Sequence, residues 1–357
     1  MKSFVIAIVV IFAIQHQLIC EVIALDHFKL LDLKVGNRQF TGRVLTHDDR
    51  TCWLLRRDGR MDHIAMNQVS AFSEAGDRFQ AHSQTELKSQ LQVEFGKSFE
   101  VRTSTHYVVV ASRGRGDSYV AVFDQIYREC VRALGSRGFT IERPEFPLIA
   151  IVFPDHASFS AYCQSEGVRA APGMVGYYLA SSNRVAMYER PDATEMDSTV
   201  IHEATHQVAF NTGIHSRVAR HPWWVVEGLA TVFEADGVRT RREMSTPVDR
   251  VNRERHLWFA EYSRKRRTAH SLESFVRDDK LFETAVLDAY SEAWALSFFL
   301  IETRSTDYGK YLRTLVARDP LAAYDADARL NDFTNAFGND LDGLETSYLK
   351  FMRRIGN

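Results

Sequence analysis

The sequence predicts an α+β protein in which a small β module precedes a larger domain of mixed sheet and helices. Three observations lead to this prediction. Short alternating apolar runs between turn residues occupy residues 27–72, a strand–helix–strand order follows over residues 100–153, and apolar residues at helical spacing dominate from Asp197 onward. The 357 residues, 45% of them hydrophobic, are enough for one large domain or two smaller ones with a sizeable core.

The first 24 residues have the layout of a secretory signal peptide, with a single lysine, an apolar run from Phe4 to Ile14 and a mixed stretch before the boundary. Val22 and Ala24 are small residues at the two positions that a signal peptidase recognises, so Leu25 is the expected new N-terminus. The apolar run is about half of the roughly 20 residues that a spanning helix needs, so a retained anchor is the alternative. We expect an exported protein, periplasmic or extracellular, that meets a membrane only if this segment is retained.

Four short strands are expected in the N-terminal module, at residues 29–35, 39–45, 51–57 and 61–66. They predict a small antiparallel barrel or sheet, SH3-like, over residues 25–75. This accessory module could bind a partner that the sequence does not identify. Residues 76–98 are polar at first and are expected to form a linker that runs into a short helix around Glu86 to Phe95.

Residues 99–357 form the expected larger domain. Its elements before the helical part are a strand, a helix, a strand, a short helix and a hairpin, at residues 100–111, 118–134, 148–153, 157–165 and 173–188. Cys130 lies in the first of these helices and is interpreted as a small buried side chain. The hairpin is predicted to supply an edge strand for an extended peptide, and replacements along Arg184 to Tyr188 would test this.

Two other features of composition are interpreted as structural. Lys and Arg number 44 against 46 Asp and Glu, so no overall field attracts nucleic acid, and we expect no nucleic-acid partner. The basic run Arg264 to Arg267 is isolated from other basic stretches and is interpreted as a solvated face. Once the signal segment is removed, three cysteines without a close pair remain, which indicates no disulfide framework.

A metal-binding pattern, His202-Glu203-x-x-His206, lies in a stretch that begins with the capping candidates Asp197 and Ser198. A helix is therefore predicted independently of the pattern. At 3.6 residues per turn the two histidines lie one turn apart on one face, so their ring nitrogens can converge on one ion. Glu203 lies about 100° around the helix, where it can reach a metal-bound water without ligating the metal.

A second helix is predicted from Pro222 to near Gly237, and Glu227 on it lies 21 positions after His206. Catalytic zinc needs a third protein ligand and an open fourth position, and Glu227 can provide the former. The sequence Glu-Gly-Leu-Ala at this point contains Gly228 and Ala230, small residues that are expected to let the two motif helices approach closely.

His-Glu-x-x-His followed about twenty residues later by Trp-x-x-Glu-Gly-x-Ala resembles the gluzincin zinc metallopeptidases, and more closely the uncharacterised exported bacterial proteins of the peptidase MA-like clan. The specific match covers residues 199–234. The resemblance implies a zincin-like core, one Zn²⁺ ion bound by His202, His206 and Glu227, and Glu203 as the general base. Tyr290, on a later amphipathic helix, is in a position that resembles the residue that donates a hydrogen bond to the oxyanion formed during attack. The alternative is that Tyr290 serves only in packing.

Further residues near the motif have competing interpretations. Thr231 and Glu234 could each orient a ligand histidine, since ligating imidazoles usually donate their other N–H to an oxygen. The alternative is that both face solvent. His215 and His221, in the loop between the motif helices, are not expected to be ligands while Glu227 is available. Trp294 and Phe298, spaced from Tyr290 like residues on one helix face, are expected in the core.

The preferred function is hydrolysis of a peptide bond in a peptide or protein substrate by zinc-activated water. One alternative is a non-catalytic zinc-binding interaction protein with a zincin fold. Glu203 argues against it, because a structural site has no use for a base beside an open position. The other alternative is a metal-free fold in which His202 and His206 are ordinary helix residues.

Overall fold

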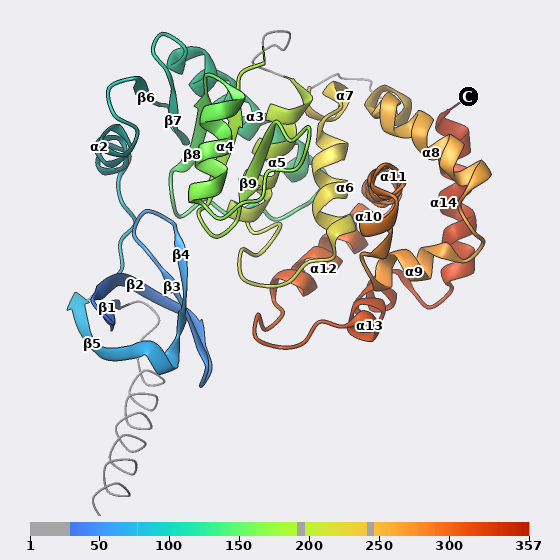
Figure 1. Ribbon diagram of the computed structural model, residues 1–357. Coiled ribbons are helices and arrows are strands. Elements are labelled where there is room, and N and C mark those ends of the chain that lie inside the picture. The colour runs from blue at the N-terminus through green and yellow to red at the C-terminus, as the bar shows by residue number, and fades with distance from the viewer. Residues whose placement is uncertain (1–28, 77, 191–196, 241–245, 357) are drawn as a thin grey trace, which may run out of the picture. The chain divides into compact units, whose positions relative to one another are not determined.

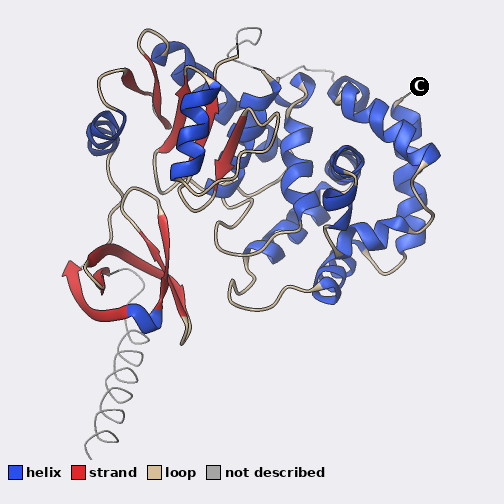
Figure 2. Cartoon of the chain, in the orientation of Figure 1, coloured by secondary structure: helices blue, strands red, loops and turns tan. Residues whose placement is uncertain are grey.

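The computed structural model describes residues 29–76, 78–190, 197–240 and 246–356. The predicted signal peptide and its cleavage site lie outside the described residues. The chain divides into two compact units, Met1–Ser83 and Gln84–Asn357 (Figure 1). Two sheets and many helices confirm the α+β class, and the strands of the described residues all precede the motif helix that begins at Ser198 (Figure 2). None of the described helices is long and apolar enough to cross a membrane.

The smaller unit contains one antiparallel sheet of five strands in the order β4-β3-β2-β1-β5. The elements are β1 (Leu30–Val35), β2 (Arg38–His47), β3 (Thr51–Leu55), β4 (Met61–Ala65), the 3₁₀ turn η1 (Met66–Gln68) and β5 (Val69–Gly76). The sequence does not predict β5. Only Val69, Phe72 and Gly76 of this strand are partly buried, so its polar composition reflects an edge strand that pairs with β1.

The larger unit begins with α2 (Gln84–Phe95) and a five-stranded mixed sheet in the order β6-β7-β8-β10-β9. The strands are β6 (Phe99–Thr103), β7 (Tyr107–Ser112), β8 (Leu148–Phe153), β9 (Gly176–Leu179) and β10 (Arg184–Tyr188). Strands β7, β8 and β10 are parallel, whereas β6 and β9 are antiparallel to their neighbours. The sheet is therefore parallel at its centre and antiparallel at both edges.

Helices cover both faces of this sheet, because successive side chains of a strand point to opposite sides. Tyr107, Val109 and Ala111 pack in the core that contains α3 (Gly116–Ser136) and α5 (Ser198–Asn211). Val108 and Val110 pack in a second core with α2 and α4 (His156–Ser165). All five residues are fully buried, which explains the continuous apolar run in the sequence.

The single strand predicted over residues 100–111 is two strands, β6 and β7, that form an antiparallel hairpin. The turn is stabilised by Ser104, whose hydroxyl oxygen accepts hydrogen bonds from the backbone N–H groups of His106 and Tyr107 at 3.3 and 3.1 Å. A serine that bonds its own backbone in this way interrupts a strand locally. The prediction of one continuous strand was wrong because it weighed apolar content and not this turn.

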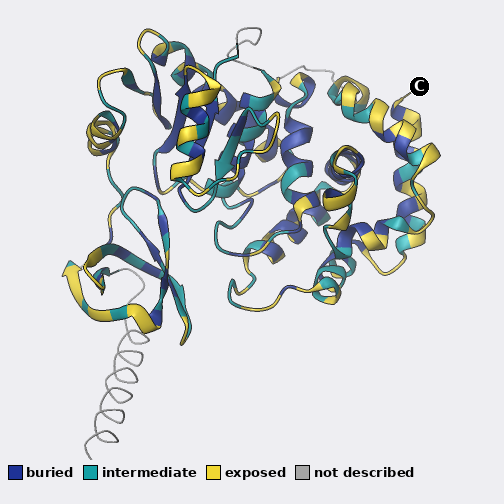
Figure 3. Ribbon diagram, viewed as in Figure 1, coloured by how far each residue is buried: buried dark blue, intermediate teal, exposed yellow. Residues whose placement is uncertain are grey.

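The rest of the larger unit is helical. Its elements are α6 (Trp223–Phe233), α7 (Asp236–Arg239), η2 (Pro247–Arg250), α8 (Arg253–Lys265), α9 (Ser271–Arg277), α10 (Lys280–Thr284), α11 (Val286–Thr303), α12 (Ser305–Val316), α13 (Ala326–Phe337) and α14 (Leu341–Ile355). The central helices α6 and α11 are mostly buried, whereas α4 and α14 expose one face (Figure 3). Trp294 and Phe298 of α11 are fully buried, which confirms their predicted place in the core.

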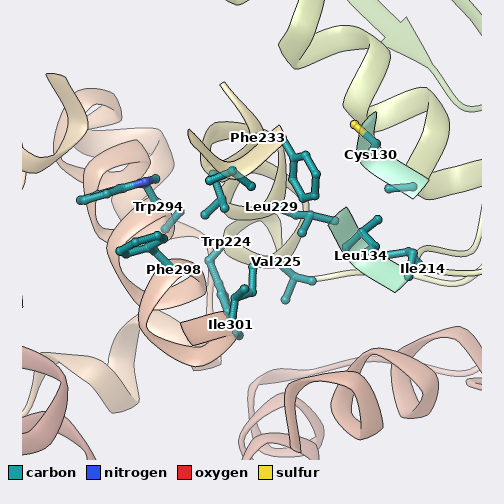
Figure 4. Packing of buried hydrophobic residues seen from close by; sticks show 14 of the residues in the cluster. Cys130, Leu134, Ile214, Trp224, Val225, Leu229, Phe233, Trp294, Phe298 and Ile301 are labelled. Carbon is teal, nitrogen blue, oxygen red and sulfur yellow. The ribbon is translucent and has the colours of Figure 1, made fainter. Parts of the chain in front are cut away.

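Helix α6 packs mainly against α11, on the side opposite to the Cys130 and Leu134 side chains of α3 (Figure 4). A Cβ at Gly228 would overlap the Ser297 hydroxyl and the Ala293 carbonyl oxygen, both on α11. Gly228 therefore permits the contact with α11, and not the close approach to α5 that the sequence predicts. Cys130 is fully buried with a free thiol, as predicted.

The basic run at residues 264–267 is not wholly a solvated face. The Arg267 side chain is 3% exposed and binds Glu292 of α11 at 3.0 Å and Glu345 of α14 at 2.6 Å. The sequence-based interpretation was wrong at this residue because its partners lie 25 and 78 positions away. The resulting ion network ties the segment just after α8 to α11 and α14.

Candidate metal centre

The motif helix α5 is fixed against the sheet by polar contacts at both ends. Asp197 is the N-cap, and its carboxylate accepts a hydrogen bond from the Val200 N–H at 3.0 Å, as the sequence predicts. Near the other end, the fully buried Gln207 donates from its amide nitrogen to the carbonyl oxygens of Ile149 and Asn183, both at 2.9 Å. These contacts set the rotation of α5, which decides where its histidines point.

The hairpin that precedes α5 is joined to the end of that helix. Asn183 occupies the left-handed region at the hairpin turn, with a φ of 58°. Its side-chain amide and that of Asn211 exchange hydrogen bonds at 2.9 and 2.7 Å. Asparagine tolerates this backbone conformation, and the amide pair links the turn to the last residue of the motif helix.

The edge of the sheet at this hairpin is β9, not β10. Strand β10 pairs with β8 on one side and β9 on the other, whereas β9 pairs with β10 alone among the described residues and contacts α5. The replacements predicted to test peptide pairing, at residues 184–188, would therefore disrupt an interior strand. The segment with an open edge beside the motif helix is Gly176–Leu179.

Three donor atoms from α5 and α6 converge on one point. His202 Nε2 lies 3.0 Å from His206 Nε2 and 3.2 Å from Glu227 Oε2, and His206 Nε2 lies 3.6 Å from the same oxygen. A zinc ion at about 2.1 Å from each ligand in a tetrahedron requires ligand atoms roughly 3.4 Å apart. The spacing of these three atoms fits such an ion, and the donor set of two imidazoles and one carboxylate suits zinc.

Glu234, at the C-cap of α6, orients His202. Its Oε1 accepts a hydrogen bond from His202 Nδ1 at 2.9 Å, and its Oε2 accepts one from the Asn252 amide at 2.8 Å. A carboxylate only accepts, so the proton of neutral His202 stays on Nδ1 and the lone pair of Nε2 points toward the shared site. Of the two residues considered from the sequence, Glu234 thus contacts the histidine.

Thr231 has a different role from either sequence-based interpretation. It is fully buried, and its hydroxyl donates to the carbonyl oxygens of Glu227 and Gly228 within its own helix at 2.7 and 3.0 Å.

Asn252, which contacts Glu234, was not found by sequence reasoning. Asn252 is the N-cap of α8 and accepts a hydrogen bond from the Arg255 N–H, a role that asparagine often has at the start of a helix. Its contact with Glu234 depends instead on how α8 packs beside α6, which a local pattern does not show.

The electrostatics of the site favour a positive charge between the donors. Burial disfavours the imidazolium form of His202, but hydrogen bonds to Glu227 and Glu234 outweigh burial and raise the pKa of His202 to about 10. Burial also opposes ionisation of Glu227, but the neighbouring His206 and His202 hold the pKa of that carboxyl far below its usual range. A divalent cation would meet the same demand for positive charge without a proton.

Glu203 and Tyr290 lie beside the three donors. Glu203 interacts electrostatically with both His202 and Tyr290, and it forms no hydrogen bond or ion pair with another residue in the part of the chain that the structure describes. The Tyr290 ring lies 6.4 Å from the His202 ring and beneath the Arg255 guanidinium at 5.5 Å. Burial, together with the charges of Glu227 and Glu203, raises the pKa of Tyr290 well above its usual value, so its hydroxyl remains a donor.

His215 and His221 pack together, with ring centroids 5.1 Å apart and Phe210 against both. Burial lowers the pKa of His221 to about 4 and that of His215 well below its usual value, so both are neutral at pH 7. Neither belongs to the group of donor atoms formed by His202, His206 and Glu227.

One family model matches the chain. It is described as a protein of unknown function (DUF1570), and the match spans residues 196–322. This segment runs from the start of α5 to just beyond α12 and contains the three donors together with Glu203, Glu234 and Tyr290. No curated protein matches the chain. The similarity therefore covers the candidate site and carries no description of activity.

Proposed function

We propose that this chain is an exported zinc-dependent peptidase of the gluzincin type, with a zincin-like core in its larger unit. The observation that carries the proposal is the convergence of His202, His206 and Glu227 within 3.6 Å, with Glu203 and Tyr290 beside them. A purely structural zinc site has four protein ligands and needs neither a base nor a hydroxyl donor. The three protein donors leave a coordination position for a water or a substrate.

In the proposed reaction, zinc held by these three residues would lower the pKa of a coordinated water toward 7 and polarise the substrate carbonyl. Glu203 takes the proton from the attacking water and later gives it to the leaving amine. Tyr290 keeps its hydroxyl proton and donates a hydrogen bond where negative charge develops on the carbonyl oxygen. Glu234 holds the His202 ring in the orientation that both steps require.

The peptide is proposed to bind as an added strand at β9, whose outer edge is unpaired among the described residues. N–H groups of a paired strand alternate between the two sides. When single backbone positions of a peptide substrate are N-methylated in turn, methylation at every second position should therefore abolish cleavage. Equal tolerance of N-methylation at every position would contradict binding in this mode.

The test of the proposed function compares two variants with the unsubstituted protein. Glu203→Gln should retain one zinc ion per chain but lose about 10²- to 10⁴-fold in turnover, because it removes the general base and no ligand. Glu227→Ala should lose zinc because it removes a ligand. The measurements are metal content and digestion of an unbiased peptide library. Full peptidase activity in Glu203→Gln would refute the mechanism, and zinc binding without any cleavage by the unsubstituted protein would favour a non-catalytic zinc protein.

A further inference from the structure

Four exposed apolar side chains of the larger unit lie on α6, α8 and α11. They are Trp223, Trp258, Val286 and Leu287, with exposed fractions of 51, 41, 50 and 50%. We call these four residues the apolar rim. Single exposed apolar residues are common in soluble proteins, whereas a cluster of them often marks a binding surface.

Two residues of the apolar rim lie one helical turn before residues of the candidate site. Trp223 precedes Glu227 by four residues on α6, and Val286 precedes Tyr290 by four on α11. Residues four apart share a helix face and are separated by about 6 Å along the axis. Each of two site residues, one candidate ligand and one hydroxyl donor, therefore has an exposed apolar side chain one turn before it.

Aromatic contacts connect the rim to the site. The Trp223 ring packs against Phe282 with centroids 5.8 Å apart, and Phe282 packs against Tyr290 at 5.6 Å. Tyr290 in turn lies 6.4 Å from the His202 ring. Phe282 is buried and holds the exposed indole in place, so the surface of Trp223 is preformed at little cost in conformational entropy.

The other three rim residues share a hollow. Trp258, Val286 and Leu287 line a cavity of about 320 Å³. The Trp258 indole N–H donates to Asp288 Oδ1 at 2.8 Å, and Arg266 binds the same carboxylate at 2.6 Å. The indole is thus fixed with its polar atom satisfied, and an apolar floor with charged groups at its border suits an apolar side chain of a ligand.

We propose that the apolar rim binds aromatic or long aliphatic side chains of the peptide substrate, and so determines the substrate class. The inference rests on the proposed peptidase function. An extended peptide advances about 3.3 Å per residue, and side chains on one face repeat about every 6.6 Å. One helical turn from Glu227 and Tyr290 therefore corresponds to a substrate residue within about two positions of the cleaved bond.

The test measures binding of peptides to the zinc-loaded Glu203→Gln protein, which separates recognition from turnover. The peptides differ only in one residue, Phe, Leu, Ala or Glu, placed in turn at the two positions on each side of the expected cleavage point. We expect at least one position at which Phe binds about tenfold or more tightly than Ala, in the range that apolar pockets provide. Trp223→Ser and, separately, Val286→Ser should reduce this preference to less than about threefold.

The matched control is Val93→Ser, because Val93 is 85% exposed on α2 and lies away from the rim. It should leave the preference unchanged. Zinc content and circular dichroism check that each variant is folded. Absence of an apolar preference, or its retention in both rim variants, overturns the inference.

Cleavage of the same peptides by the unsubstituted protein is measured in parallel. Cleavage that ignores the side chain, together with unchanged binding in the rim variants, refutes the apolar rim and leaves the peptidase proposal standing. An apolar preference in binding that the rim variants lose, without cleavage of any peptide, supports the rim and refutes the proposed catalysis.

Discussion

Removal of the Glu234 carboxylate should weaken zinc binding although Glu234 is not one of the three converging donors. Its two oxygens accept hydrogen bonds from His202 Nδ1 at 2.9 Å and from Asn252 at 2.8 Å. Glu234→Ala deprives both donors of their partner. An unsatisfied buried N–H costs about 1–3 kcal/mol, and loss of the carboxylate that orients a metal-binding histidine typically weakens metal binding about 10- to 100-fold. These two magnitudes agree, because tenfold corresponds to about 1.4 kcal/mol.

Glu234→Gln provides a graded version of the same experiment. A carboxylate accepts on both oxygens, whereas an amide accepts on one, so either His202 or Asn252 loses its acceptor. We therefore expect a smaller loss of zinc affinity, about tenfold. Both variants are titrated against a competing chromophoric chelator at fixed pH.

The matched control is Glu254→Gln, which removes an exposed carboxylate from the first turn of α8 and touches none of the candidate ligands. A surface charge change of this kind should alter zinc affinity less than about threefold. Unchanged affinity in Glu234→Ala would refute the orienting role, and an equal loss in Glu254→Gln would show that only the overall charge matters.

Four further predictions concern the scaffold and the protonation of the site. Gly228→Ala should lower the free energy of unfolding by about 1–3 kcal/mol, since overlap with α11 exceeds the helix-propensity gain of about 1 kcal/mol, and an unchanged or raised melting temperature would contradict this. Because the pKa of His202 in the folded protein is raised to about 10, zinc must displace a proton from this ring. The affinity for zinc should therefore rise about tenfold per pH unit between about pH 7 and 8. Calorimetry in buffers of different ionisation enthalpy should detect about one proton released. In the metal-free protein the same raised pKa contributes stability that is fully present below about pH 6.5 and is lost as pH rises toward 10, so a melting temperature that increases over this range would oppose the assignment. Arg267→Met leaves Glu292 buried without its cation and should cost about 3–5 kcal/mol in denaturant unfolding, whereas the exposed Arg264→Met should stay within about 0.5 kcal/mol; equal effects would refute the buried network.

Local periodicity accounts for the features that the sequence predicts correctly. The α+β class follows from apolar residues that recur every second position in strands and at helical spacing in helices. The N-cap at Asp197, and the core positions of Trp294 and Phe298, follow from the same local rules. These features depend on residues within a few positions of one another, so the sequence is sufficient to predict them.

Turns and strand edges were less predictable. The Ser104 hydroxyl divides an apolar stretch into β6 and β7, and the polar strand β5 resembles a linker in composition. Strand order is also invisible to a local pattern, because β9 and β10 have similar sequences of apolar and polar residues but only β9 lies at the edge. The edge proposed for peptide binding was therefore changed from β10 to β9 by the sheet order.

The spacing of His202 and His206, one helical turn apart, was determined by the sequence alone, because helix geometry fixes it. Tertiary structure decided that Glu234 and not Thr231 contacts His202, that Gly228 faces α11, and that Arg267 is buried. Each of these facts depends on how helices separated in sequence pack together. A polar side chain can be satisfied by solvent, by its own backbone or by a distant residue, and only the packed chain selects among these partners.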